Sequence, residues 1–172
     1  MAVLTKSEIL KLLKNGKLKI KPFDEKDVGP GSIDLHLGNT FRVFKKSHEI
    51  FHVNDDVDHK DITNVVEVDD KSYFMVMPSE MVHGITKEHI SLPSNISGRI
   101  EGRSRFARIG LLTHVSSGFI QPGTSSKVVL EMVNLSPMPL AIYPETKICQ
   151  IILEETKGSE KYHGKFSEQE RI

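Results

Sequence analysis

The sequence predicts a mainly β protein with one short helix near its N-terminus. Short segments in which Val, Ile, Leu, Phe or Tyr alternate with polar residues recur along the chain, and Gly, Pro, Asn or Ser separates them. Strands at this spacing are typical of a β-barrel or sandwich, whereas βαβ units would need helical patterns between the strands. The 172 residues, 38 % of them hydrophobic, suffice for a buried core, so we expect a single domain over residues 1–172.

A helical pattern opens the chain. Thr5 and Glu8 have the spacing of a capping box, and Ile and Leu side chains form a stripe over residues 9–13. Gly16 is a natural stop for this helix. The strands expected after it cover residues 17–21, 33–37, 41–44, 65–68, 73–77, 96–100, 127–133 and 147–153.

Composition excludes several classes of protein. The 23 basic and 23 acidic residues balance, so the chain is not a general polyanion binder, and we expect no nucleic-acid partner. Cys149, the single cysteine, excludes a disulfide scaffold and a multi-cysteine zinc or iron–sulfur site. The N-terminus lacks the apolar core of a signal peptide, and no apolar run approaches the ~20 residues that span a bilayer. We therefore expect a cytoplasmic protein without a membrane partner.

Charge is uneven along the chain although it sums to zero. Residues 45–70 hold eight acidic side chains against three lysines, which predicts a solvated loop or hairpin. Residues 98–110 invert this balance, with four arginines against Glu101. Because arginine forks match phosphate oxygens, this second segment is a candidate anion site.

One metal-like motif lies in the acidic segment. His48-Glu-Ile-Phe-His52 has the H-E-x-x-H spacing of zinc proteases, in which the two histidines share one face of a helix. The flanking Phe and Val residues favour a strand, on which the two histidines would lie roughly 13 Å apart, too far for one zinc ion. We interpret the motif as a chance occurrence. Zinc-dependent base deamination is excluded as well, because one cysteine cannot supply its P-C-x-x-C pair.

The arginine-rich segment contains a candidate site at residues 101–111. Gly102 permits a close backbone approach, and Ser104 can cap a short helical turn whose N–H groups would face an anion. Ser104 and Arg108 are four residues apart and would share one face of that turn. A surface turn with solvated arginines explains the same pattern, and spacing alone leaves both interpretations open.

A second candidate is Glu131, on the strand expected at 127–133. Alternation places Glu131 on the same face as Val129 and Val133. A carboxylate on an apolar face is costly unless it is paired or functional, so Glu131 is a candidate general base. A structural glutamate paired with an arginine such as Arg108 is the alternative.

Several motifs occur in an order that is typical of one enzyme family. The pattern G-R-S-x-x-A-R-x-G-L is followed by H-V-S-S-G-F-I-Q-P-G and then by V-V-L-E-x-x-N. Residues 29–38 match a P-x-S-I-D-L-x-L-G strand, residues 147–151 a penultimate strand, and residues 162–169 a substrate-closing tail. Nearly end to end, the chain resembles the dCTP deaminase family of the dUTPase-like superfamily.

The resemblance implies a distorted dUTPase-like β-barrel that forms a homotrimer, with active sites between subunits and no catalytic metal. Glu131 would activate water for attack at cytosine C4, Ser104 would orient that water, and Arg108 would hold charge near the reacting centre. The substrate triphosphate would carry Mg²⁺, and a tail at about 157–172 would close over it. The substrate-binding residues implied by the resemblance are Arg103, Ser104, Arg105, Phe106, Ala107, Arg108, Val115, Ser116, Ser117, Gln121, Val129, Leu130, Glu131, Gln150, Tyr162, Lys165 and Gln169.

The resemblance implies a role for several members of this set. Arg103 and the backbone of residues 104–108 would bind phosphates, and the main chain of residues 115–117 would bind the base. Val129 and Leu130 would line the pocket. The last two of the set, Lys165 and Gln169, would fold over the triphosphate.

The implied reaction is hydrolytic deamination of dCTP to dUTP and ammonia, which feeds dUMP and dTTP synthesis; dUTP and dTTP are further candidate ligands. Ser117-Gly-Phe119 resembles the A-G-W of the diphosphatase and bifunctional branch more than the A-H-R of strict deaminases. The alternatives are a dUTP diphosphatase or bifunctional enzyme that gives dUMP and pyrophosphate, and a non-catalytic nucleotide-binding paralogue. The departures from the family pattern are Gln121 for Asp, Thr124 for an aromatic residue, Ser126 for Gly and Arg105 for Ser.

Overall fold

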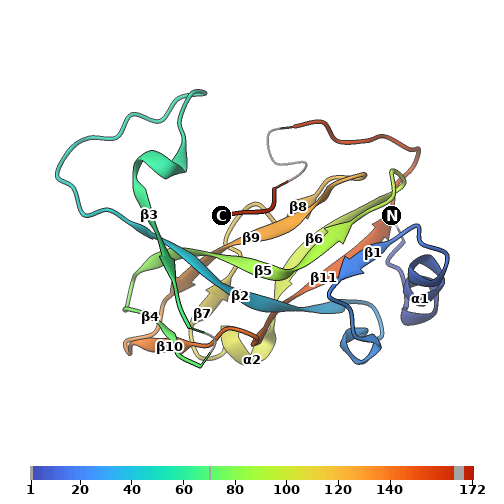
Figure 1. The fold of residues 1–172 in the computed structure, drawn as a ribbon, viewed down its shortest axis with the longest axis horizontal. Helices are drawn as coiled ribbons and strands as arrows, with labels where there is room; N and C mark the ends of the chain where they lie inside the picture. The colour runs from blue at the N-terminus through green and yellow to red at the C-terminus, as the bar shows by residue number, and fades with distance from the viewer. Residues whose placement is uncertain (1, 70, 165–168) are drawn as a thin grey trace.

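An antiparallel sheet that curls on itself forms the body of the protein (Figure 1). Our computed structural model describes residues 2–69, 71–164 and 169–172. The helical elements are α1 (Lys6–Lys14) and α2 (Ser104–Ala107), with 3₁₀ turns η1 (Glu25–Asp27) and η2 (His59–Asp61). The strands are β1 (Lys19–Lys21), β2 (Ile33–Phe44), β3 (Thr63–Glu67), β4 (Phe74–Val76), β5 (Met81–Ser91), β6 (Ile96–Gly102), β7 (Leu111–Thr113), β8 (Phe119–Ile120), β9 (Ser125–Asn134), β10 (Leu140–Ile142) and β11 (Lys147–Glu155).

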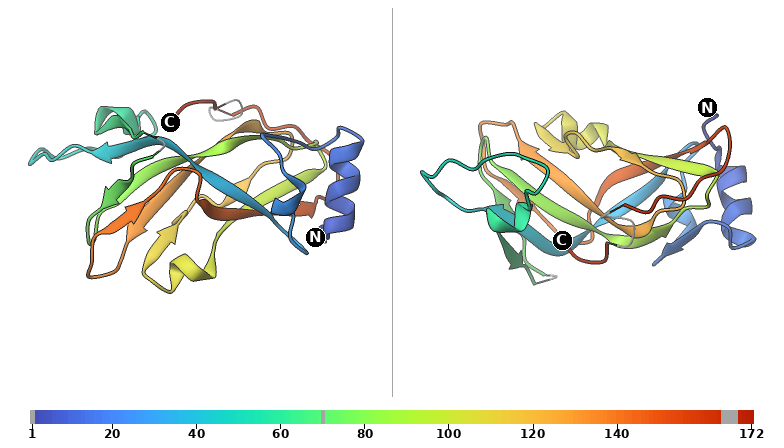
Figure 2. Two further views of the ribbon diagram at one scale, coloured as in Figure 1. Left: turned by 60° about the horizontal axis from the view of Figure 1, so that its bottom comes forward. Right: turned by 90° about the horizontal axis from the view of Figure 1, so that it is seen from above.

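The strand order brings distant parts of the sequence together. The main sheet runs β7-β9-β5-β2-β11-β6-β8, with β1 paired to β5 and β3 paired to β2, while β10 and β4 form a separate two-stranded sheet. Figure 2 shows α1 at one end of the curled sheet and the long loop after β2 at the other. Because β5 lies between β2 and β9, side chains from three separate segments share one surface at the centre of the sheet.

Alternating residues of the strands fill the core. On β9, Leu130 and Met132 are fully buried, whereas Glu131 between them is half-buried on the opposite face. Phe41 of β2 is also fully buried and stacks on Phe74, with ring centroids 4.4 Å apart. The alternation expected for Glu131 is therefore confirmed, and so is the mainly β class with a short N-terminal helix.

Helix α1 forms where it was expected, with Ile9 fully buried. The capping box is wrong. Thr5 occupies the N-cap position, but its hydroxyl is hydrogen-bonded to the Ser7 hydroxyl at 3.1 Å and makes no cap bond to the helix backbone. Glu8, the other half of the expected box, pairs with Lys11 at 2.6 Å. Each side chain bonds another side chain in place of the backbone N–H that the capping box would use.

The predicted strands form, but two predicted segments merge into one strand, and β5, β7, β8 and β10 were not predicted. Segments 33–37 and 41–44 are one strand, β2, because Gly38 lets the chain pass the carbonyl oxygen of Ile85 where a Cβ would lie only 3.0 Å away. Strand β5 was not predicted, since polar residues interrupt its apolar pattern. One of them, Glu88, is buried and lies 2.9 Å from the backbone N and 2.6 Å from Nδ1 of His36. Strand β5 therefore forms because it pairs with β2 and β9, although its own sequence lacks the alternating pattern of a strand.

The acidic segment is an exposed loop that leads into a β2–β3 hairpin, as expected. The strand expected around His48 and His52 is wrong: both lie in the loop, which projects from the sheet with no strand beside it to pair with (Figure 1).

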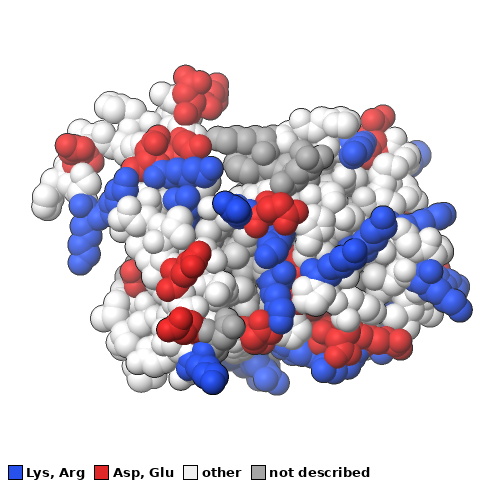
Figure 3. Space-filling view, viewed as in Figure 1, with Lys and Arg blue, Asp and Glu red and all other residues white. Residues whose placement is uncertain are grey.

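On the face drawn in Figure 3, acidic and basic side chains are interspersed. Among the described residues, no helix has the length and apolarity needed to cross a membrane.

Candidate active site

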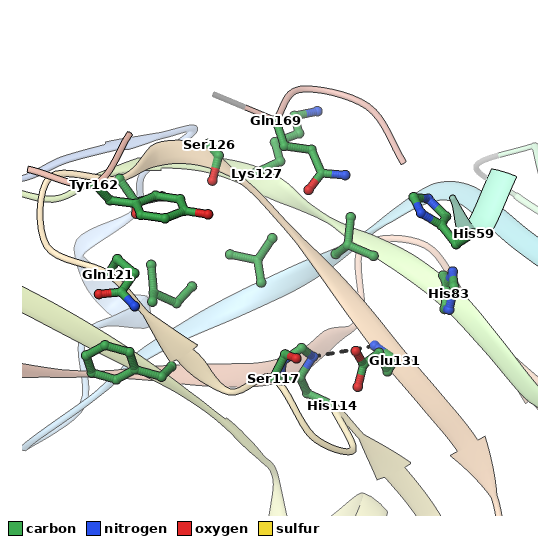
Figure 4. A pocket seen from close by; sticks show the side chains of 15 residues that line it. His59, His83, His114, Ser117, Gln121, Ser126, Lys127, Glu131, Tyr162 and Gln169 are labelled. Carbon is green, nitrogen blue, oxygen red and sulfur yellow. Dashed lines mark hydrogen bonds between the residues drawn. The ribbon is translucent and has the colours of Figure 1, made fainter. Parts of the chain in front are cut away.

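A cavity of about 500 Å³ lies between strand β9, strand β8 and the C-terminal segment (Figure 4). It brings together six of the predicted site residues, which are Ser117, Gln121, Val129, Glu131, Tyr162 and Gln169. Its other lining residues are His59, His83, His114, Phe119, Ile120, Thr124, Ser126, Lys127 and Val128. Gln121 and Tyr162 lie at one end of the cavity and Glu131 lies at the other (Figure 4).

Glu131 is fixed in the cavity by the turn after β7. Its Oε2 accepts hydrogen bonds from the backbone N–H and the hydroxyl of Ser116, at 3.1 and 3.0 Å. No described residue donates to Oε1, so this oxygen can accept a hydrogen bond from a ligand. The alternative of a structural pair with Arg108 is wrong for the described part of this chain, where Ser116 holds the carboxylate. An oriented carboxylate with one available oxygen suits a general base.

Three histidines, His59, His83 and His114, line the cavity with Glu131, and sequence reasoning assigned a role to none of them. His114 adopts a left-handed backbone conformation (φ 69°), and its Nδ1 lies 3.5 Å from the backbone N of Glu131. His83 lies on β5 directly opposite Glu131, with the His59 ring edge-on to its own at 5.7 Å. Burial lowers the pKa of His83 below its usual value; His59 and Arg42 add to this effect and Glu131 opposes it. His83 was missed because β5 itself was not predicted.

The arginine-rich segment at residues 101–111, here called the arginine turn, does not line the cavity. Helix α2 forms there, but its N-cap is Arg103 and no side chain caps it, so the cap expected from Ser104 is wrong. The Arg103 guanidinium donates a hydrogen bond to the backbone carbonyl of Lys147 at 3.1 Å, and another of its nitrogens lies 3.4 Å from a carboxylate oxygen of Asp34. Phe106 is half-buried against the core. The exposed residues of the turn are Ser104, Arg105, Ala107 and Arg108.

Three further predicted residues lie beside the cavity or away from it. The Leu130 side chain is fully buried in the core, so the prediction that it lines the pocket is wrong for that side chain; strand alternation turns it away. Gln150 of β11 accepts a hydrogen bond from the Ser32 hydroxyl at 2.7 Å. Val115 is 48 % exposed on the turn that also carries Ser116.

The C-terminal segment runs back across the cavity. Gln169 accepts a hydrogen bond through its backbone carbonyl from the N–H of Lys127 at 2.8 Å, and the Tyr162 N–H donates to Pro122 at 3.0 Å. His89 lies 2.9 Å from the carboxylate of Glu170. Lys165, which was predicted to bind the triphosphate, lies outside the described residues.

The cavity lining can be compared with the oxygen ligands that Mg²⁺, expected with the substrate, would need. Glu131 is the carboxylate in the lining, and its Oε2 is already committed to Ser116. Mg²⁺ prefers several oxygen ligands and readily takes them from phosphate and water. This donor set suits an ion that arrives on the phosphates of a nucleotide.

Comparisons with known proteins bear on the fold and the family. The phage 80alpha dUTPase of Staphylococcus, solved with dUpNHpp, superposes with a TM-score of 0.52 at 12 % identity, over 86 % of this chain and 96 % of that one. A 2'-deoxycytidine 5'-triphosphate deaminase from Agrobacterium tumefaciens superposes with a TM-score of 0.66 at 21 % identity. It matches 89 % of this chain, which spans 48 % of that structure's length. Both likenesses confirm the dUTPase-like fold.

Relatives and a family model set the chain among known sequences. The dCTP deaminase, dUMP-forming, of Streptomyces coelicolor is 38 % identical over 174 residues, which cover 97 % of this chain and 91 % of that protein. The protein of the same name from Corynebacterium kroppenstedtii is 40 % identical over 151 residues, or 88 % of this chain and 80 % of the relative. The family model described as dCTP deaminase-like matches residues 3–156. On these matches, the chain belongs to the dCTP deaminase-like family.

Proposed function

We propose that this protein is a bifunctional enzyme that converts dCTP to dUMP, releasing ammonia and pyrophosphate. The observation that carries the proposal is the Glu131 carboxylate at one end of a nucleotide-sized cavity, with Oε2 held by Ser116 and Oε1 available. The dUMP-forming names of the relatives at 38 and 40 % identity favour this function over release of dUTP as the end product.

The first reaction is deamination. Glu131 takes a proton from a water molecule, whose oxygen then adds to C4 of cytosine. The C4–N4 bond breaks after N4 has received this proton from Glu131, so ammonia leaves. The second proton of the water moves from the added oxygen to ring N3, and C4 keeps the oxygen as O4 of dUTP. The main chain at residues 115–117 binds the base beside Glu131, and the two hydrogen bonds from Ser116 keep the carboxylate in place between the two proton transfers.

The second reaction is hydrolysis at the α-phosphate of dUTP. Water attacks the α-phosphorus, and the bond to the oxygen that bridges the α- and β-phosphates breaks, which gives dUMP and pyrophosphate. Gln121 and Tyr162 lie at the end of the cavity opposite Glu131, where the sugar and phosphates belong if the base lies beside Glu131 (Figure 4). Lys165 and Gln169 of the tail bind the triphosphate, and Mg²⁺ carried by the phosphates offsets their charge.

A complete site needs a second subunit of a homotrimer. Ser104 and Arg108 are exposed on α2 and do not line the cavity, although the family resemblance gives both a place beside the reacting centre. In the trimer that we propose, α2 of one subunit covers the cavity of its neighbour. Exposed arginines on a short turn then meet the phosphates instead of bulk water.

A product analysis tests the proposed function. The protein is incubated with dCTP and Mg²⁺, and ammonia, dUTP, dUMP and pyrophosphate are quantified over time. We expect ammonia, dUMP and pyrophosphate in equal amounts. Accumulation of dUTP without pyrophosphate would replace the proposal with a deaminase that stops at dUTP, and the absence of all four would indicate a nucleotide-binding paralogue.

A further inference from the structure

Residues 169–172, here called the tail end, are fastened to the sheet by polar contacts. The backbone carbonyl of Gln169 accepts a hydrogen bond from the N–H of Lys127 on β9 at 2.8 Å. Nε2 of His89 on β5 lies 2.9 Å from the carboxylate of Glu170. Because His89 is the register partner of Lys127, the two contacts are neighbours on the sheet.

Ile172 supplies the apolar part of this attachment. Its side chain is only 6 % exposed, and it lies in a second cavity, of about 730 Å³, that residues of β2, β3 and β5 line. Ile85 of β5 and Val65 of β3 are the large apolar side chains in the same lining. Burial of an isoleucine contributes more than an exposed polar pair such as His89 with Glu170, so we expect Ile172 to dominate the attachment.

The attachment also orients the side chain of Gln169. Its Nε2 donates a hydrogen bond to the backbone carbonyl of Arg171 at 3.1 Å. The same side chain lines the cavity that contains Glu131 (Figure 4). An amide nitrogen carries two hydrogens, so one remains for an acceptor such as a phosphate oxygen. Because Arg171 directly precedes the buried Ile172, the position of its carbonyl depends on that burial.

We infer that Ile172 and Glu170 are positioning residues, which fasten the tail end to the sheet and so hold the Gln169 amide where it meets the triphosphate. The inference rests on the proposed function, in which Gln169 binds the triphosphate. Ile172 and Glu170 belong to the lining of the second cavity and not to the described lining of the nucleotide cavity. They therefore act through Gln169 and not by contact with the substrate.

A fastened tail end lowers the cost of binding a nucleotide. A segment that becomes ordered only with its ligand loses conformational freedom at that moment, which weakens the observed affinity. The tail has a further attachment upstream, where the Tyr162 N–H donates to the carbonyl of Pro122 at 3.0 Å. With both attachments in place, less freedom is lost when the triphosphate binds. Loss of the Ile172 side chain should therefore weaken binding of the triphosphate and leave binding of the base unchanged.

Amide hydrogen exchange, followed by NMR, measures the attachment without a ligand. The Lys127 N–H is bonded to Gln169, so this amide should exchange about tenfold faster in Ile172→Ala than in the wild type, as expected when apolar burial no longer holds the segment. The Val128 N–H donates to the Thr86 hydroxyl at 2.9 Å instead, so its exchange should not change. An unchanged rate at Lys127, or an equal acceleration at Val128, would overturn the inference.

Nucleotide affinity measures the consequence of the attachment. The probes are dUpNHpp, a dUTP analogue that resists cleavage between its α- and β-phosphates, and dUMP, which lacks the β- and γ-phosphates. By calorimetry with Mg²⁺, we expect Kd for dUpNHpp to rise about tenfold in Ile172→Ala and Kd for dUMP to stay within about twofold. Glu170→Gln removes an exposed pair, so Kd for dUpNHpp should rise less than about fivefold. Ile172→Val, which keeps most of the buried side chain, should lie between the wild type and Ile172→Ala.

The matched control is Ile50→Ala, the same substitution at a loop side chain that is 83 % exposed, and it should change neither exchange nor affinity. Three results with nucleotides would overturn the inference: an unchanged Kd for dUpNHpp in Ile172→Ala, an equal rise of Kd for both probes, and an Ile172→Val variant as weak as Ile172→Ala. Failure of the proposed function is distinct. The wild type would then release neither ammonia nor pyrophosphate from dCTP, while amide exchange would still measure the attachment.

Discussion

Glu131 and the arginine turn are two parts of one predicted site, and the fold holds them in contrasting ways. Glu131 lies on β9, which pairs with β5 on one side and β7 on the other, and its carboxylate is hydrogen-bonded to Ser116. Arg108 ends a helix of four residues and is exposed. The contrast teaches that the fold of one chain fixes the Glu131 carboxylate, whereas it leaves the arginine side chain of the turn exposed, which is why we propose that another subunit completes that part of the site.

The largest effect is expected at the preorganised part. Glu131→Gln keeps the shape of the side chain but cannot accept the proton of water, so kcat for ammonia release should fall about 10²–10⁴-fold. Affinity for dCTP, measured by calorimetry, should stay near that of wild type. Glu155→Gln, an exposed carboxylate at the end of β11, is the matched control. Retention of more than a tenth of the wild-type kcat would remove Glu131 from the role of base.

At the exposed arginine turn we expect a comparable loss of turnover with no loss of folding stability. Arg108→Ala should abolish turnover while leaving the free energy of unfolding within about 0.5 kcal/mol of wild type, as is usual for a surface position. Co-refolding Arg108→Ala with Glu131→Gln should restore part of the activity, because some mixed trimers combine an intact α2 with an intact Glu131. Verified mixed trimers without activity would contradict a site shared between subunits.

A smaller effect is expected at Gln121, which lies at the end of the cavity opposite Glu131 (Figure 4). Gln121→Asp should leave deamination within a few-fold of wild type, since a changed acceptor at a sugar hydroxyl shifts one hydrogen bond by about 1 kcal/mol. A carboxylate there can also orient water, so pyrophosphate release from dUTP should rise. A large loss of deamination with no gain in pyrophosphate would show that the two ends of the cavity are not independent.

The smallest effect concerns stability and pH. The pKa of His83 is lowered in the folded protein, so the unfolded chain binds a proton at this residue more readily as the pH falls below about 6.5. The protein should lose stability in that range, and His83→Leu should lose less of it. The measurement is the difference in Tm between pH 7.5 and pH 5.5 for both proteins. An equal difference in the two would show that His83 does not couple to unfolding.

The local sequence pattern was enough to predict some elements of this protein. Alternation on β9 correctly assigned Glu131 to the same face as Val129 and Val133, because the side-chain period of a strand does not depend on its neighbours. The N-terminal helix and the exposed acidic loop also followed from the sequence. The order of the motifs indicated the family and its dUTPase-like fold before any contact was known.

Tertiary structure decided what lies around Glu131. Strand β5 carries buried polar residues such as Glu88 and His83, which hide its strand pattern and are stable only because β2 and β9 pair with it on both sides. Arg42 pairs with His83 and His83 pairs with Glu131 across three strands, although Arg42 and Glu131 are 89 positions apart in sequence, and no local signal encodes that register. The sequence by itself predicted candidate residues for the chemistry, and it determined the face of β9 that Glu131 occupies. Only the folded sheet decided their neighbours, because cross-strand pairing joins residues that are remote along the chain.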